Sequence, residues 1–327
     1  MVGARKRTVP LRMSEERPIT FTLLTASRNE EQDIRLSIES ALAQTYPHKE
    51  IIFVDDSTDR TKDIIREYAG RGVILINGRG EGCCRARNLG MQRATGDVIV
   101  FLTADTKLEP DYLERILPYY REGYDWVTVE SRTLNQESAY ARFVEMDRRL
   151  LEWKRDYDPY TTQGYSVRRD AALAVGMITG GVYPANFCRD WSLGKKLMES
   201  GKYKKKFDRS IVVLHKSPDN FPEYWQVRKA RGLMSAYQPY FLFHQSPLSL
   251  FFKFIAKDIA AFFHFALIFP AAWRVARVAR YSNRPARDFL LFYYAYFLQI
   301  LARCVGEWQG LKLIARCNAK TLRAAAQ

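Results

Sequence analysis

Cysteine is scarce in this sequence, with five among 327 residues, and no two of them are spaced as C-x-x-C. The number is odd, and Cys83 and Cys84 are adjacent. Structural zinc sites and disulfide frameworks need pairs of cysteines at regular spacings. Neither is therefore predicted, and reduced thiols in a cytosolic compartment are the simpler interpretation.

The sequence also shows no secretory leader at its N-terminus. Basic residues occupy Met1–Arg17, but no apolar segment follows them, as a signal peptide would require. We therefore expect residues 1–18 to be a basic N-terminal tail, and the catalytic part of the chain to stay on the cytoplasmic face.

No apolar run reaches the roughly 20 residues that cross a bilayer. The nearest are Ile259–Trp273, interrupted by Pro270, and Phe289–Ala302. The arginines between them are Arg274, Arg277, Arg280, Arg284 and Arg287. A hairpin of two spans would place these arginines outside, against the positive-inside tendency. The alternatives are helices in the interface plane, one longer tilted span over Leu248–Trp273, or buried helices of a soluble domain.

Positive charge is concentrated in the last third of the chain. The formal net charge is +15, and residues 226–327 hold 15 basic residues against three acidic ones. Basic, aromatic-rich segments bind nucleic acid, anionic membranes or phosphorylated ligands. Here the basic residues flank apolar runs, which favours membrane lipids and argues against nucleic acid. We expect residues 226–327 to be an interfacial and transmembrane helical region at the cell membrane.

Residues 19–225 alternate between strand-like and helix-like segments. Apolar runs such as Glu50–Val54 and Asp97–Leu102 are separated by amphipathic stretches such as Glu30–Gln44. This order predicts an α/β domain whose sheet is mostly parallel and covered on both faces. Ligands bind such sheets beyond the carboxyl ends of the strands. That rule selects two polar clusters, Asp55–Ser57 and Thr103–Asp105.

Several motifs in this domain occur together in one order. They are T-A-S-R-N-E-E at 25–31, A-Q-T-Y-P at 43–47, Asp55-Asp56-Ser57, Arg87-Asn88-Leu89-Gly90 and F-L-T-A-D-T at 101–106. This set resembles the family-2 inverting glycosyltransferases, which have a Rossmann-like GT-A fold. The aromatic membrane part is most similar to cellulose-synthase-like and dolichol-pathway enzymes, in particular archaeal membrane mannosyltransferases.

The resemblance implies a nucleotide-sugar site that uses Mn²⁺ or Mg²⁺. Asp105 matches the metal-binding aspartate of the family's Asp-x-Asp motif, whose first position here is Thr103. His215, at the end of a strand-like run, is a second candidate ligand, although a lone histidine there is more often structural. The residues expected at the nucleotide and donor are Ala26, Arg28, Glu30, Asp56, Arg85, Asn88, Ala104 and Asp105.

The resemblance also implies an acceptor side. Asp190 matches the family's catalytic base, and Arg189 replaces the usual acidic neighbour. An adjacent arginine is expected to lower the pKa of Asp190 and keep it ionised. Gln163 and Gly164 resemble the acceptor loop. Gln226 and Lys229 match a phosphate-binding motif in part, and a solvated basic helix is an equal interpretation.

The function predicted from these features is transfer of a sugar from a nucleotide sugar to a lipid-linked acceptor. Mannose from GDP-mannose and a polyprenyl (dolichyl) phosphate or lipid-linked glycan are preferred, on the resemblance alone. A UDP-sugar-dependent polysaccharide or glycolipid synthase is the alternative. A catalytically degenerate membrane scaffold is the alternative of another class, and Thr103 and Arg189 are the features that favour it.

Overall fold

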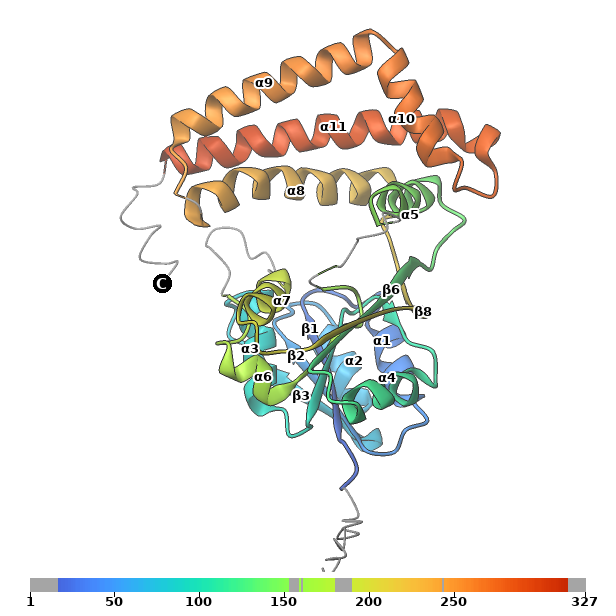
Figure 1. Ribbon diagram of the computed structural model, residues 1–327, viewed down its shortest axis with the longest axis vertical. Coiled ribbons are helices and arrows are strands. Elements are labelled where there is room, and N and C mark those ends of the chain that lie inside the picture. Colours follow the sequence, from blue (N-terminus) through green and yellow to red (C-terminus); the bar gives the residue numbers. More distant parts are fainter. Residues whose placement is uncertain (1–16, 153–158, 160, 180–189, 243, 317–327) are drawn as a thin grey trace, which may run out of the picture.

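The protein is described from a computed structural model that covers residues 17–152, 159, 161–179, 190–242 and 244–316. It has two layers, an α/β domain and a layer of long helices lying across one side of it (Figure 1). Residues of both layers line one cavity, so their arrangement positions the candidate site.

The α/β domain is built on one eight-stranded sheet with the order β3-β2-β1-β4-β7-β6-β8-β5. The apolar runs seen in the sequence form its central strands, and the β4 residues are all buried. The strands are β1 (Phe21–Ser27), β2 (Lys49–Asp55), β3 (Val73–Asn77), β4 (Val98–Leu102), β5 (Thr106–Lys107), β6 (Trp126–Thr133), β7 (Ser166–Arg168) and β8 (Lys205–His215).

The sheet is mixed, with a parallel half formed by β3, β2, β1 and β4. Strand β7 runs antiparallel to both of its neighbours, and β5 runs antiparallel to β8. The predicted GT-A-like α/β fold is confirmed, and the carboxyl ends of β1, β2 and β4 meet at one edge as expected. The antiparallel strands are short, which explains why hydrophobic patterning did not reveal them.

Helices cover both faces of the sheet and enclose two hydrophobic cores. One core packs α1, α2 and α4 against residues such as Leu23 and Val100; the other packs α3, α6 and α7 against residues such as Leu24 and Ile99. The helices of this domain are α1 (Ile34–Leu42), α2 (Thr61–Glu67), the short 3₁₀ helix η1 (Ala69–Arg71), α3 (Cys83–Arg93), α4 (Tyr112–Arg121), α6 (Arg169–Ala174) and α7 (Asp190–Glu199).

The helical layer contains α5 (Ala139–Glu152), α8 (Phe221–Leu242), α9 (Pro247–Ala266), α10 (Phe269–Ala279) and α11 (Pro285–Arg316). Helix α5 comes from the middle of the predicted catalytic segment, yet Phe143 and Met146 pack with α8, α10 and α11. Buried ion pairs add to this contact, including Arg142 Nη2 to Asp288 Oδ1 at 2.7 Å, where Asp288 is fully buried. The helical layer therefore combines α5, from the middle of the sequence, with four helices from its C-terminal part, and α5 links the layer to the α/β domain.

Helices α8 and α11 lie against each other at a glycine-lined contact. A Cβ atom at Gly306 would lie 2.0 Å from the Lys229 carbonyl oxygen, and one at Gly232 would lie 2.1 Å from the Arg303 carbonyl oxygen. Only glycine lets the two backbones approach this closely. The contact joins α8, which borders the candidate site, directly to α11, the longest helix that the structure describes.

The two apolar runs noted in the sequence adopt different structures. The run Phe289–Ala302 lies within the 32-residue α11, which by length and composition is long and apolar enough to cross a membrane. The run Ile259–Trp273 is divided between α9 and α10, which meet at an angle of 82°. The structure thus confirms a C-terminal helical region with an apolar helix.

We predict that Gly306→Ala destabilises the protein. Helix propensity alone would make this change stabilising by about 1 kcal/mol. The clash with the Lys229 carbonyl should reverse the sign and lower the free energy of unfolding by about 1–3 kcal/mol. Thermal unfolding in detergent measures it, with Gly70→Ala as control, since nothing lies within 4 Å of a Cβ at Gly70. Equal unfolding temperatures for the two variants would contradict the close contact.

Candidate functional site

A buried carboxylate joins the loops that follow β1 and β2. Asp55 is fully buried; it accepts hydrogen bonds from the Ser27 hydroxyl at 2.5 Å and from the Ser57 amide at 2.8 Å. The Asn29 amide donates to the Ser57 hydroxyl at 2.7 Å, and Asn29 adopts a left-handed φ of 58°. Asp55 therefore organises the edge of the sheet, and the next residue, Asp56, is left to face a cavity.

Asp56 is held by the glycine-rich loop that follows β3. Its Oδ1 atom accepts a hydrogen bond from the Gly80 amide at 2.7 Å. A Cβ atom at Gly78 would lie 2.1 Å from the same oxygen, so this position admits only glycine without displacing the carboxylate. The glycines of this loop thus serve to position Asp56.

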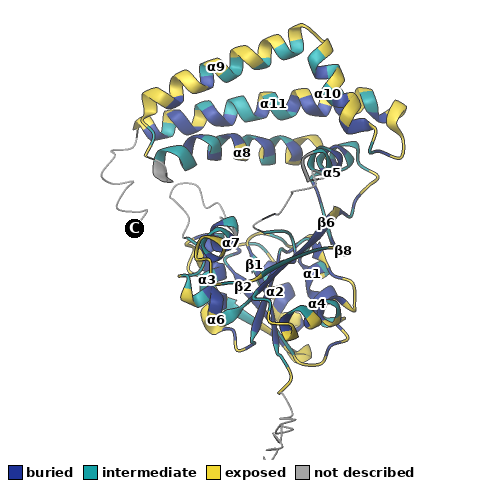
Figure 2. Cartoon of the chain, in the orientation of Figure 1, coloured by how far each residue is buried: buried dark blue, intermediate teal, exposed yellow. Residues whose placement is uncertain are grey.

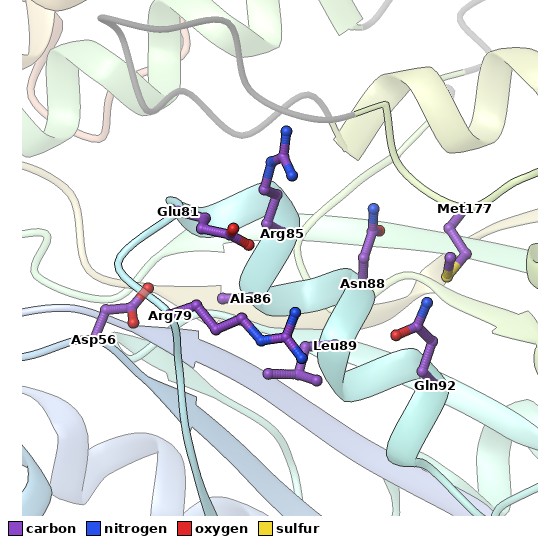
Figure 3. Close-up of a pocket in the computed structure, with 9 residues that line it drawn as sticks. All are labelled: Asp56, Arg79, Glu81, Arg85, Ala86, Asn88, Leu89, Gln92 and Met177. Carbon is purple, nitrogen blue, oxygen red and sulfur yellow. The ribbon is translucent and has the colours of Figure 1, made fainter. Parts of the chain in front are cut away.

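Asp56 borders a cavity of about 210 Å³ on one side of α3 (Figure 3). Arg85, Asn88, Leu89 and Gln92 come from one face of that helix, following the i, i+3, i+4, i+7 spacing. The loop residues Arg79 and Glu81 and, beside Asn88, Met177 complete the wall (Figure 3).

Asn88 has a structural role in this wall of the cavity. Its amide nitrogen donates to the Ile178 carbonyl at 2.8 Å, and its amide oxygen accepts from the Ile178 backbone N–H at 3.1 Å. The side chain thus ties α3 to the segment before α7. It lines the predicted nucleotide cavity while two of its hydrogen-bonding groups are already engaged.

A second cavity of about 300 Å³ adjoins the first and shares Asp56 and Ala86 with it. It lies over the carboxyl ends of β1 and β4, as the strand-end rule predicted. Among the predicted donor-binding residues, it is lined by Ala26, Arg28, Glu30, Asp56, Ala104 and Asp105, and His215 lies on its wall.

Asp105 and His215 come together because β5 pairs with β8. The antiparallel register sets Thr106 opposite His215, and the Lys216 amide donates to the Asp105 carbonyl at 3.0 Å. Asp105 Oδ2 then lies 3.1 Å from His215 Nε2. Burial alone would raise the pKa of Asp105, but its interaction with His215 holds that pKa below the ordinary value. Asp105 is therefore a carboxylate at neutral pH.

A divalent cation fits this pair by donor chemistry and spacing. Carboxylate oxygen suits Mn²⁺ and Mg²⁺, and imidazole nitrogen is a common partner ligand. Two neighbouring ligands of one octahedral ion lie about 3 Å apart when each binds at about 2.1 Å. The separation of 3.1 Å between Asp105 and His215 agrees with that value.

Glu30 faces the same cavity and carries an unusual pKa. Burial is the main cause of the shift, and the negative charges of Asp105 and Asp33 add to it, raising the pKa of Glu30 from 4.5 to about 7. Sequence patterns do not reveal this shift, because its main cause is burial and its largest charge contribution comes from Asp105, which is distant along the chain.

A third cavity of about 520 Å³ extends from Asp105 and His215 towards the helical layer. Gln163 lines it, and its side-chain oxygen accepts from the Thr103 hydroxyl at 3.4 Å. The adjacent Gly164 has φ +72°, and a Cβ there would lie 2.8 Å from Val213 Cγ2. The positive φ and the nearby Val213 side chain together favour glycine at position 164. The cavity opens between the two layers.

The wall supplied by the helical layer differs from the sequence prediction. Glu223, Val227 and Arg231 line this cavity from one face of α8, at i, i+4 and i+8, and Arg148 joins them from α5. Gln226 and Lys229 do not line it; they lie elsewhere on α8, and the Lys229 backbone packs against Gly306. The rotation of α8, set by its contact with α11, turns other residues of this helix towards the cavity, and a phosphate-binding role for Gln226 and Lys229 stays a prediction.

The predicted base lies at the margin of the described chain. Arg189 lies outside the described residues. Asp190 is the first residue of α7, and its side chain is not described.

The three cavities adjoin one another along the carboxyl edge of the sheet, and we call them together the groove. The first two share Asp56 and Ala86, and the second and third share Asp105 and His215. A ligand that occupied all three would extend from Asp56, past the Asp105–His215 pair, to the helical layer.

Comparison with known proteins agrees with this fold and groove. Residues 22–173 match the glycosyl transferase family 2 model, and this part of the chain is a family 2 glycosyltransferase domain. The chain is 35% identical over 125 residues to the undecaprenyl-phosphate 4-deoxy-4-formamido-L-arabinose transferase of Pectobacterium carotovorum, covering 36% of this chain and 38% of the relative. It is 28% identical over 114 residues to the glucosyl-dolichyl phosphate glucuronosyltransferase of Haloferax volcanii, covering 34% and 36%. The chain spans less than half the length of the curated relatives that it matches.

A solved structure shares the fold over most of the chain. It is the mannosyltransferase PcManGT of Pyrobaculum calidifontis, in complex with GDP-Man and Mn²⁺. The TM-score is 0.57 at 17% identity, with 90% of this chain and 87% of that one covered. The likeness extends beyond the α/β domain and supports a common GT-A architecture.

We predict that Glu30→Gln stabilises the metal-free protein at alkaline pH. Between pH 4.5 and about 7 the folded protein keeps a proton on Glu30 that the unfolded chain releases. The free energy of unfolding of the wild type should therefore fall as the pH rises through this window, and not recover above it. The variant has no ionisable group at position 30, so its free energy of unfolding should lack this decrease, which amounts to at most about 3 kcal/mol.

Chemical unfolding in EDTA at about pH 5 and about pH 8 tests this prediction. Glu122→Gln, at the exposed end of α4, is the matched control. A Glu30→Gln variant that gains nothing relative to wild type between the two pH values would contradict the raised pKa.

Proposed function

We propose that this protein is a membrane-bound, metal-dependent, inverting glycosyltransferase that moves a sugar from a nucleotide sugar to a lipid-linked acceptor. The observation that carries the proposal is that the three adjoining cavities share wall residues. Asp56 lies at one end, the Asp105–His215 pair in the middle, and the helical layer at the other end.

The nucleotide occupies the end of the groove at Asp56. The carboxylate, oriented by the Gly80 amide, accepts a hydrogen bond from a ring N–H of the base. Arg85 lies along the same wall, where its charge favours the diphosphate. Ala26, Arg28, Glu30 and Ala104 border the donor on the opposite side. Asn88 supports this wall through Ile178.

Asp105 and His215 hold Mn²⁺ or Mg²⁺. A bound divalent cation would neutralise the charge that develops on the departing nucleoside diphosphate. Two features of the chain prepare the pair for this role. Asp105 is kept ionised, and Glu30 faces the same cavity, where a bound cation would favour the loss of its proton.

The acceptor enters through the third cavity, between the α/β domain and α8. Arg148 and Arg231 there match an acceptor that carries phosphate. A sugar hydroxyl needs a base that removes its proton as it attacks the anomeric carbon, and Asp190 is the residue assigned to this task. A phosphate acceptor is already an anion and needs no such base. In both cases attack opposite to the leaving group inverts the anomeric centre.

Mannose from GDP-mannose is the preferred donor, and the complex of the structural neighbour with GDP-Man and Mn²⁺ supports it. A polyprenyl phosphate or polyprenyl-linked glycan is the preferred acceptor, supported by the undecaprenyl- and dolichyl-phosphate activities named for two relatives. We place residues 19–225 on the cytoplasmic face of the cell membrane, with residues 226–327 as the membrane region. A screen of GDP- and UDP-sugars by thermal shift with Mn²⁺ separates the donors, because a bound donor raises the unfolding temperature.

We predict that Asp105→Ala abolishes metal-dependent donor binding. Calorimetry with the donor should show an affinity at least about tenfold weaker than wild type in Mn²⁺, and no further change when EDTA is added. Asp111→Ala, an exposed aspartate that precedes α4, is the control. Equal donor affinity with and without Mn²⁺ in the wild type would overturn the metal assignment.

We predict that Asp190→Asn leaves donor binding intact and lowers kcat for a hydroxyl acceptor by about 10²–10⁴-fold. Transfer to a lipid phosphate should be unaffected. Radiolabelled sugar recovered in lipid extracts measures both reactions, and Asp111→Asn serves as control. Unchanged turnover of Asp190→Asn with a hydroxyl acceptor would rule out Asp190 as the base.

A further inference from the structure

Exposed apolar side chains gather on one surface of the helical layer. Fifteen of the 18 large hydrophobic residues that are exposed in the described chain lie between Leu248 and Leu301. Ten of them belong to α9, α10 and the corner between these helices, whose ribbon is largely exposed in Figure 2 on the side away from the α/β domain, and the other five belong to α11. We call this set the outer apolar face. Its members are Leu248, Phe251, Phe252, Ile259, Phe262, Phe263, Leu267, Ile268, Phe269, Trp273, Leu290, Leu291, Tyr294, Phe297 and Leu301.

The direction of α11 argues against a crossing helix. Helices α8, α9 and α11 run side by side, and α8 and α5 lie between α11 and the α/β domain (Figure 1). A helix that crosses a bilayer leaves the aqueous domain behind, whereas α11 runs along it. The glycine contact also ties α11 to α8, which carries Arg228, Lys229 and Arg231. Placing α11 across the hydrocarbon would draw these charges in with it, at a cost of several kcal/mol.

At the corner between α9 and α10 the chain reverses and returns towards the α/β domain (Figure 1). The two helices meet at 82°, at Leu267 and Ile268. Ile268 has a left-handed φ of 57°, a strained conformation for a β-branched residue. Leu267, Ile268 and Phe269 are 64–74% exposed, so the corner is a continuous apolar projection. Figure 1 places it at the point of the described helical layer that is most distant from the α/β domain.

Positive charge borders this face. Arg277 on α10, Arg280 directly after it, and Arg284 and Arg287 at the start of α11 are exposed at the end of α10 that is opposite to the corner, and Lys253 is exposed on α9. Arginine and lysine at the margin of an apolar surface pair with anionic lipid headgroups, each contributing about 1 kcal/mol. If the chain turns back at the corner, these arginines stay on the same side of the membrane as the catalytic domain. The conflict with the positive-inside tendency then disappears.

We propose that α9 and α11 lie along the plane of one leaflet of an anionic bilayer, that α10 returns from the corner towards the headgroups, and that the chain does not cross the membrane between Pro247 and Arg316. The corner at Leu267–Phe269 lies deepest, and the basic residues contact headgroups. The third cavity then opens close to the membrane surface, where a lipid-borne acceptor is held. The arrangement rests on the helical layer alone and does not depend on the proposed transferase activity.

Thiol labelling of the full chain in sealed vesicles tests the topology. The vesicles contain phosphatidylcholine and phosphatidylglycerol, with the catalytic domain facing outward. Variants Asn283→Cys and Lys312→Cys place exposed thiols before α11 and near its end, and Glu122→Cys reports the catalytic domain. A membrane-impermeant maleimide is added, and mass spectrometry assigns the label to each peptide, which separates these sites from the native cysteines. An in-plane α11 predicts that all three sites react without detergent. If either end of α11 reacts only after the vesicles are opened, the helix crosses the membrane and the proposal is wrong.

Flotation with the same vesicles tests the partner. The double variant Phe262→Ser and Phe263→Ser should reduce the vesicle-bound fraction at least about tenfold, because each buried phenylalanine contributes more than 1.4 kcal/mol. Ile74→Ser is the matched control, since Ile74 is 44% exposed but lies on β3, outside the outer apolar face. Binding should also weaken in pure phosphatidylcholine and at high salt. A wild-type protein that fails to float, and instead forms a dimer that the double variant disrupts, would assign the face to a second copy and overturn the proposal.

Discussion

The pairing of β8 with β5 is the constraint on which the rest of the molecule depends. Through it, His215 reaches Asp105, although the two residues are far apart in the sequence. Lys216 follows at once and forms an ion pair with Asp33 at 3.0 Å, which closes the groove near α1. The chain then enters α8 at Phe221. One strand therefore completes the candidate metal site and also sets the position of the helical layer above it.

The helical layer in turn determines which residues of α8 face the third cavity. Backbone contact at Gly232 and Gly306 sets the rotation of α8 about its axis. That rotation turns Glu223, Val227 and Arg231 towards the cavity. The helical layer is thus a wall of the candidate site, and in our proposal it is also the part of the chain that contacts the membrane.

The sequence predicted best where function follows from position along a single strand. Asp56 directly follows β2, Asp105 comes three residues after the end of β4, and the carboxyl ends of those strands meet at one edge. The sequence does not predict the environment of a residue whose neighbours come from distant segments of the chain. The raised pKa of Glu30, the engagement of Asn88 by Ile178 and the contribution of Arg231 all require tertiary contacts. The membrane topology belongs to the same class, because the length of an apolar run does not reveal its direction relative to the domain.

The central claim is that one groove holds a nucleotide at Asp56 and a cation at Asp105 and His215. Crystals grown with Mn²⁺ and a nucleoside diphosphate, measured for manganese anomalous scattering, test it most directly. The account predicts a manganese peak between Asp105 Oδ2 and His215 Nε2, with the base against Asp56. Manganese bound only elsewhere, for instance at the acidic and thiol side chains of Asp258, Cys304 and Glu307 between α9 and α11, would contradict it. So would a nucleotide bound outside the groove.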